Sequence, residues 1–148
     1  MSAPTAHDAN PFLHSDAAAR LLVDLRQSTD GRTGDRLSSV IRAVTTAGST
    51  LPPDQVDAAI AAIALLLTHY EPALLNGAQD EDGLRTWLHD VDTELTPGRM
   101  LAASAALARI ELNLDNEWYT AHVQAGTLTA ALGTVRRLRD SLADATSG

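Results

Sequence analysis

Apolar residues recur every three to four positions along most of this chain of 148 residues. That spacing puts them on one face of an α-helix, whereas alternating runs of β-branched and aromatic residues, typical of strands, are nearly absent. The pattern is clearest over residues 128–142, where the stripe consists of Leu128, Ala131, Leu132, Val135, Leu138 and Leu142. The chain is therefore predicted to be all-α.

Turn and capping residues divide the first half into three helices. Ser15 suits an N-cap with Asp16 in the first turn, and the stripe that follows is Ala18, Leu21, Leu22 and Leu25. A second helix is expected over 35–47, ending at Gly48, with the stripe Leu37, Val40, Ile41 and Val44. Pro53 opens a third helix, which Pro72 ends near Tyr70. This helix is apolar almost all round and is expected to be central, through Val56, Ile60, Ile63, Ala64, Leu65, Leu66 and Leu67.

The second half predicts an acidic loop and four further helices. The loop spans 76–83, and a short helix over 84–95 presents Leu84, Trp87, Leu88 and Val91. The next helix begins at Thr96 and Pro97, ends near Leu112, and is expected to pack through Leu101, Ala105 and Ala108. Asn116 is expected to cap the sixth helix, Gly126 to end it, and Thr127 or Thr129 to begin the seventh.

These segments predict a compact orthogonal or antiparallel array of about six to seven helices around one central apolar helix. Residues 1–11 are expected to form a flexible tail and residues 12–144 a single domain.

The charge and composition exclude several function classes. The net charge of −8 disfavours nucleic-acid binding and favours a basic protein partner. The only basic cluster, Arg136, Arg137 and Arg139, is expected to complement the dipole of its helix. The chain has no cysteine, and its longest apolar stretch, 56–67, is interrupted by Asp57 and shorter than the roughly 20 residues of a membrane span. We expect a cytoplasmic protein without a membrane segment or cofactor.

Short motifs in a characteristic order resemble one protein family. The motifs are Asn10-Pro11-Phe12 before Ser15-Asp16-Ala17-Ala18, the alanine-rich helix at 57–67, Trp87-Leu88, residues 103–110 before Asn116-Glu117-Trp118-Tyr119, and residues 138–142. Over about residues 10–143 they resemble domain-of-unknown-function family 4259, a family of small bacterial proteins. The chain departs from the family pattern at Thr5-Ala6-His7-Asp8, where the family often has Trp-Gly. It also departs at Ile60 or Ile63, where the family often has glutamate. The resemblance implies no activity and no catalytic residue.

Polar residues of three segments are candidates for chemistry. The acidic residues of the 80–94 segment could ligate Ca²⁺ or Mg²⁺, but they lack the order of an EF-hand and favour a solvated surface: Asp80, Glu81, Asp82, Asp90, Asp92 and Glu94. Histidines and nearby carboxylates could share a proton or metal, although helix-end and tail positions explain them better: His69, Glu71, His89 and Asp90, and separately His7, His14 and Asp16. The sequence therefore assigns no catalytic residue and no metal ligand.

Aromatic residues provide the strongest binding hint. Trp118 and Tyr119 are adjacent in the first turn of a predicted helix, so both are not expected to be fully buried. A partly exposed tryptophan or tyrosine is typical of an interface, although core packing with the polar tip outward explains the pair better. The candidate binding residues are Asn116, Glu117, Trp118, Tyr119, His122 and Trp87.

Three hypotheses follow from these observations. The first is a non-enzymatic helical binding or regulatory protein, in one version an immunity-type protein that masks a basic toxin. The second is a small metal- or carboxylate-dependent enzyme using His69, Glu71, His89 and Asp90. The third is a homo-oligomeric structural protein, a homodimer that pairs through a surplus apolar face such as that of 128–142.

Overall fold

The computed structural model describes residues 10–28, 31–46, 51–78, 80–91, 93–112 and 117–147. Within these residues the chain forms α-helices, one 3-10 helix and no strand, which confirms the predicted all-α class. In chain order the elements are α2 (Asp16–Gln27), α3 (Thr33–Thr46), α4 (Pro53–Leu67), η1 (Pro72–Leu75), α5 (Glu81–Asp90), α6 (Pro97–Leu112), α7 (Glu117–Ala125) and α8 (Leu128–Ser147).

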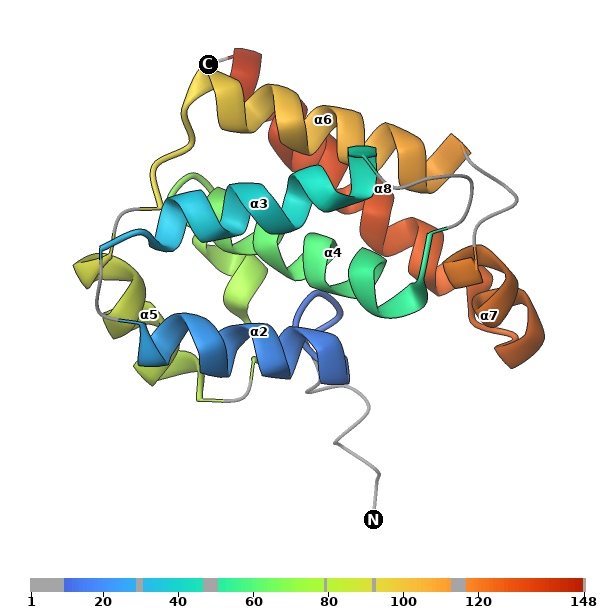
Figure 1. Cartoon of the computed structure of the whole chain (residues 1–148), viewed down its shortest axis with the longest axis horizontal. Coiled ribbons are helices and arrows are strands. Elements are labelled where there is room, and N and C mark those ends of the chain that lie inside the picture. Colours follow the sequence, from blue (N-terminus) through green and yellow to red (C-terminus); the bar gives the residue numbers. More distant parts are fainter. Residues whose placement is uncertain are drawn as a thin grey trace.

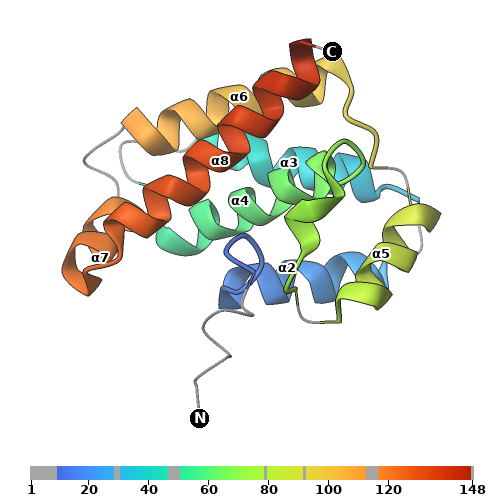
Figure 2. The same ribbon diagram turned by 180° about the vertical axis from the view of Figure 1, so that it is seen from behind.

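Helix α4 is the centre of the molecule and contacts α2, α3, α6, α7, α8 and η1. Helix α3 covers it on the side seen in Figure 1, and α8 crosses it on the opposite side, seen in Figure 2. Every residue from 59 to 67 is buried, as expected for a helix that carries apolar side chains on all its faces. The predicted central helix is confirmed, although it ends at Leu67 rather than near Tyr70.

Helices α2 and α3 each bury one face against α4. The Ser15 Oγ accepts a hydrogen bond from the Ala18 backbone N at 3.1 Å, which confirms the predicted N-cap of α2. Helix α3 begins at Thr33, earlier than the expected residue 35, and Gly48, its expected end, lies outside the described residues. Of the two predicted stripes, the fully buried members are Ala18, Leu25, Leu37, Ile41 and Val44, and the half-buried members are Leu21, Leu22 and Val40.

The chain is anchored to the core already at Asn10, which is 3% exposed. Its Nδ2 donates to the carbonyl oxygens of Leu74 at 2.6 Å and Asn76 at 3.0 Å. Its Oδ1 accepts from two backbone N–H groups that follow, those of Phe12 and Leu13. Asn10 therefore already belongs to the folded part of the chain.

Helix α5 differs in position from its prediction. It spans Glu81–Asp90 rather than 84–95, so the expected loop 76–83 is shorter. Acidic residues in its first turn favour an early start, and Glu81 also accepts hydrogen bonds from the backbone N of Gly77 at 3.1 Å and from Arg85 at 2.8 Å. The acidic residues were interpreted as part of a loop, so the predicted start of the helix is too late.

Helix α6 has the expected bounds but packs through a different face. Its expected stripe of Leu101, Ala105 and Ala108 is exposed, so that prediction is wrong. The residues that face α3, α4 and α8 are instead Ala103, Ala106, Leu107 and Ile110. Because α6 is apolar on two faces, spacing alone could not decide which of them enters the core.

The last two helices are separated by Gly126, whose φ of +74° is accessible to glycine and ends α7 as predicted. Helix α8 buries the central part of its predicted stripe, Val135, Leu138 and Leu142. The half-buried members are Leu128, Ala131 and Leu132. The arginines of α8 make specific ion pairs: Arg136 and Arg139 with Glu111 of α6, and Arg137 with Glu71.

Among the described helices, none combines the length and the apolar character needed to cross a lipid bilayer.

Candidate functional site

A pocket of about 270 Å³ opens where the start of α2, the first turns of α4, helix α7 and the start of α8 meet. Apart from one carboxylate and two imidazoles, its walls are aliphatic, aromatic or hydroxyl-bearing. The lining residues are Pro11, His14, Ser15, Asp57, Ile60, Trp118, His122, Thr127, Ala130, Ala131 and Thr134.

The carboxylate of Asp57 is held in the pocket by Trp118. The indole Nε1 donates a hydrogen bond to the Asp57 Oδ1 at 3.0 Å, and the indole is only 1% exposed. The Trp118 backbone N also donates to the carbonyl oxygen of Leu51 at 3.3 Å, which places the first turn of α7 beside the entry to α4. The tryptophan is therefore a core residue whose one polar atom points at the pocket carboxylate.

The environment of Asp57 disfavours its negative charge. Burial raises the pKa of the Asp57 carboxyl above its ordinary value of 3.8, and this effect exceeds the lowering by the Trp118 hydrogen bond and by the nearby His122 and His14. The carboxylate of Asp54, one turn earlier on α4, adds a smaller raising effect on the same pKa. In the described part of the chain, no arginine forms an ion pair with Asp57, and the hydrogen bond from Trp118 goes to its Oδ1.

Two imidazoles flank this carboxylate. The His122 ring meets Trp118 edge-on, with ring centroids 4.7 Å apart and an angle of 71° between the planes, and its Nδ1 lies 2.7 Å from Thr127 Oγ1. The His14 Nδ1 donates to the carbonyl oxygen of Asn10 at 3.1 Å. The pocket thus offers acceptor atoms and apolar walls, a combination suited to a cationic donor with an aliphatic stem.

A second hollow, of about 390 Å³, adjoins this pocket along α8. The two share Pro11, Ala130 and Thr134, and the second continues past Gly133 to Arg137. An added Cβ at Gly133 would meet no atom within 4 Å, so the surface there is open. The small residues of α8 therefore line a path along which an extended segment could lie.

The predicted binding residues are only partly brought together. Trp118 and His122 line the pocket, Tyr119 is half-buried, Glu117 is exposed and Asn116 lies outside the described residues. Trp118 is buried and Tyr119 is half-buried, which agrees with the expectation that the two are not both fully buried. The indole N–H points at the pocket carboxylate rather than at the surface.

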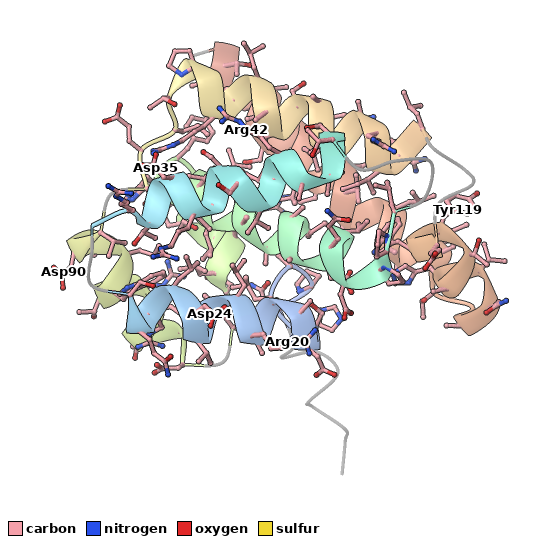
Figure 3. All side chains as sticks on the ribbon, viewed as in Figure 1. Arg20, Asp24, Asp35, Arg42, Asp90 and Tyr119 are labelled. Atoms are coloured by element: carbon pink, nitrogen blue, oxygen red, sulfur yellow. The ribbon has the colours of Figure 1, made fainter. Side chains whose placement is uncertain are left out.

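Trp87 is far from this group. It belongs to α5, and α5 and α7 lie at opposite ends of the molecule in both views (Figures 1 and 2). The labelled side chains of Asp90 on α5 and Tyr119 on α7 show the same separation (Figure 3). Trp87 therefore cannot contribute to a site built around Trp118 and His122.

The histidines proposed for the enzyme hypothesis share a smaller pocket, of about 140 Å³, that is lined by Thr68, His69, Pro72, Arg85, Leu88 and His89. Neither carboxylate of that hypothesis lines it, since Glu71 pairs with Arg137 and Asp90 is exposed. The His69 Nε2 lies 2.6 Å from the Thr93 hydroxyl, which explains its position structurally.

The acidic segment forms ion pairs rather than a ligand cluster. Asp80 pairs with Arg26 at 3.0 Å and Glu81 with Arg85 at 2.8 Å, whereas Asp92 lies outside the described residues. Across the described ranges, no three histidine, aspartate or glutamate side chains are arranged to hold a metal ion. His7, from the predicted tail group, also lies outside the described residues.

Asp57 is the site residue that sequence reasoning missed. The sequence showed it only as a charge that interrupts the apolar stretch 56–67. The available signal was a carboxylate within an otherwise apolar central helix, because a carboxylate is rarely buried unless it is paired with a charge or hydrogen-bonded. The contact with Trp118, 61 positions later in the chain, could not be read from spacing.

No family model, curated protein or solved structure matches this chain. The resemblance to domain-of-unknown-function family 4259 therefore stays a prediction, and the function is argued from the pocket itself.

Proposed function

We propose that this chain is a non-enzymatic helical binding protein whose Asp57 pocket receives a lysine or arginine side chain of a basic protein partner. The observation that carries the proposal is a half-buried carboxylate that forms no ion pair with an arginine within the described residues. Because burial raises the pKa of Asp57, a guanidinium or ammonium group that enters the pocket would relieve the cost of its charge.

The lining supports a side chain of this shape. Ile60, Ala130 and Ala131 supply apolar contacts for an aliphatic stem, and the Asp57 carboxylate would accept the terminal N–H groups. The net charge of −8 would speed the encounter with a basic partner, and this effect would weaken as salt screens it.

An immunity-type role is the most specific form of this proposal. Such a protein would mask the basic surface of a toxin, and the acidic charge of this chain supports that role. Co-expression with the toxic product of an adjacent gene would test it: rescue by the wild-type chain and not by Asp57→Asn supports the role, and absence of any rescue removes it.

The binding proposal itself can be tested with a small probe. We expect N-acetyl-arginine methylamide, followed by NMR, to shift the resonances of Trp118 and His122 in the wild-type protein and not in Asp57→Asn. The isosteric but uncharged N-acetyl-citrulline methylamide should give no shift in either protein. Asp54→Asn is the matched control, since Asp54 is on the same helix, is exposed and pairs with Arg20 outside the pocket.

Two results of this NMR experiment would contradict the proposal. If the arginine probe binds Asp57→Asn as well as the wild type, the carboxylate does not recognise the cation. If neither protein responds at millimolar probe, the pocket does not take a basic side chain.

One observation favours a carboxylate-dependent enzyme as a second candidate function. The raised pKa of Asp57, with two histidines in the same pocket, is an arrangement that acid–base catalysis uses. The two functions differ in the fate of the bound molecule: recovery of the ligand unchanged supports binding, and its conversion at a rate lost in Asp57→Asn supports catalysis.

A further inference from the structure

The outward face of α6 carries no charged residue. Its two large members, Leu101 and Leu112, are 74% and 76% exposed. The exposed positions of this helix are Pro97, Gly98, Leu101, Ser104, Ala105, Ala108 and Leu112. A solvated helix face normally carries charged side chains, so this face, which we call the α6 face, is unusual for an acidic protein.

The charged residues of α6 are instead turned toward neighbouring elements. Arg99 donates to the Glu94 carbonyl oxygen at 2.7 Å, and Arg109 donates to the Thr45 carbonyl oxygen at 3.3 Å. Glu111 accepts from two arginines of α8. Every charge on the helix is therefore engaged at its flanks, and the α6 face is left neutral.

Among the described residues, the face of α6 is a better candidate for an interface between chains than the stripe of α8. The stripe over 128–142, from which the homodimer hypothesis started, buries Val135, Leu138 and Leu142 inside the chain's own core. In both ribbon views α6 runs along an outer edge of the molecule, where another chain could reach it (Figures 1 and 2).

The pattern of the α6 face reads the same in both directions. Leu101, Ala105, Ala108 and Leu112 follow one another at steps of four, three and four residues. When two copies of such a helix pair antiparallel about a two-fold axis, the two alanines lie over each other at the centre. Each Leu112 then lies beside the Leu101 of the other copy. Central alanines allow close approach of the helix axes, and self-complementarity is what an isologous interface requires.

A cavity lies beside Leu101, where the antiparallel pairing places Leu112 of the other copy. It has a volume of about 260 Å³, opens beside Leu101 between α6 and α8, and is lined by Met100, Leu101, Ser104, Arg139, Leu142, Ala143 and Thr146. Each copy would therefore offer one protruding Leu112 and one largely apolar hollow, so the two-fold contact fills both hollows.

We propose that the α6 face is a homodimer interface in which two copies pair antiparallel through α6, with Leu112 of each copy seated in the hollow beside Leu101 of the other. Charge favours a second copy over the basic partner at this face, because it has no carboxylate to attract a cation. Two chains of charge −8 repel each other elsewhere and can meet most closely where neither is charged.

The area of the face sets the expected strength. Helix α6 has 16 residues, so at 1.5 Å per residue it is about 24 Å long. A strip of that length and about 10 Å width covers about 240 Å² per chain, well below the roughly 800 Å² per partner of a standard interface. The dimer should therefore dissociate on dilution and strengthen with added salt, whereas binding to a basic partner should weaken with salt.

Cysteine cross-linking tests the pairing geometry directly, because the chain has no cysteine of its own. Leu101→Cys and Leu112→Cys chains should form a mixed disulfide when combined under mild oxidation. Neither should cross-link to itself, because eleven residues of helix separate the equivalent positions by about 16 Å along the axis. Self-linked Leu112→Cys with no mixed product would overturn the antiparallel arrangement.

Sedimentation velocity tests the interface itself. We expect the wild type to shift from monomer to dimer with rising concentration, and Ala108→Glu to stay monomeric with unchanged helix content by circular dichroism. Ala121→Glu is the matched control, an exposed alanine on α7, and should dimerise normally. Asp57→Asn should also dimerise normally, so this test is independent of the pocket.

Three outcomes would reject the proposal. The first is a wild type that stays monomeric at millimolar concentration, and the second is a dimer that Ala108→Glu leaves intact. The third is a monomeric wild type that binds phosphatidylcholine vesicles and loses that binding in Ala108→Glu, which would make the α6 face a membrane-contact surface instead.

Discussion

Replacement of Trp118 by phenylalanine removes the hydrogen bond on which the pocket depends while it keeps an aromatic ring in the core. A hydrogen bond to a charged acceptor contributes about 1.5–3 kcal/mol, and the half-buried position of Asp57 favours the lower end of that range. The smaller ring also leaves a void beside α4, at a cost of about 1 kcal/mol. We therefore expect Trp118→Phe to lower the free energy of unfolding by about 2–4 kcal/mol.

A double-mutant cycle with Asp57→Asn separates the two contributions. The asparagine oxygen can accept the same hydrogen bond, but a neutral acceptor is worth only about 0.5–1.5 kcal/mol. Trp118→Phe should accordingly cost about 1 kcal/mol less in the Asp57→Asn background than in the wild type. The void contributes equally in both backgrounds and cancels from the difference.

Urea unfolding followed by far-ultraviolet circular dichroism measures all four proteins on one scale. Trp87 is retained in every variant and gives an independent fluorescence signal from the other end of the molecule. Equal costs of Trp118→Phe in both backgrounds would refute the reasoning, because the indole would then act only by packing.

Three further predictions follow from the same structure. Because burial raises the pKa of Asp57 in the folded state, the native protein holds this proton more tightly than the unfolded chain, and the contribution of the group to stability falls as pH rises from 3.8 through its folded-state pKa. Urea unfolding across that range should show this fall in the wild type relative to Asp57→Asn, and parallel curves would contradict it. Asn10→Ala should lower the unfolding free energy by about 2–4 kcal/mol, since it removes two donated and two accepted hydrogen bonds in a buried site, and a loss under about 0.5 kcal/mol would show that the anchor is dispensable. Ser141→Ala should raise the unfolding free energy by up to about 1 kcal/mol, because the buried Ser141 Oγ has no hydrogen-bond partner within the described residues, and a clear loss of stability would argue that the hydroxyl is satisfied.

Sequence reasoning located the helices well because their signals are local. The Ser15 cap, the proline before Asp54 and Gly126 each mark a boundary through the backbone of their own turn, and the structure has helix ends at these places. The central position of α4 was also predictable, since a helix with apolar residues on all sides must be covered on all sides.

The face of α6 and the site could not be obtained in the same way. Both sides of α6 are apolar at helical spacing, so its orientation depends on α3 and α8, which flank it. The pocket joins residues from the chain start, α4, α7 and α8, and its key contact, Trp118 with Asp57, is a tertiary one. The sequence indicated Trp118 as notable because it is adjacent to Tyr119, but the indole acts through its N–H and not through an exposed surface.

Carbon-13 NMR titration of the Asp57 side-chain carboxyl, with and without N-acetyl-arginine methylamide, measures whether this pocket holds a carboxylate that a cation stabilises. We expect a pKa above the ordinary aspartate value in the free protein, and a fall in that pKa when the guanidinium group binds, because the cation favours the charged form. An Asp57 that titrates at its ordinary pKa and does not respond to the arginine probe would show that the pocket does not recognise a basic side chain.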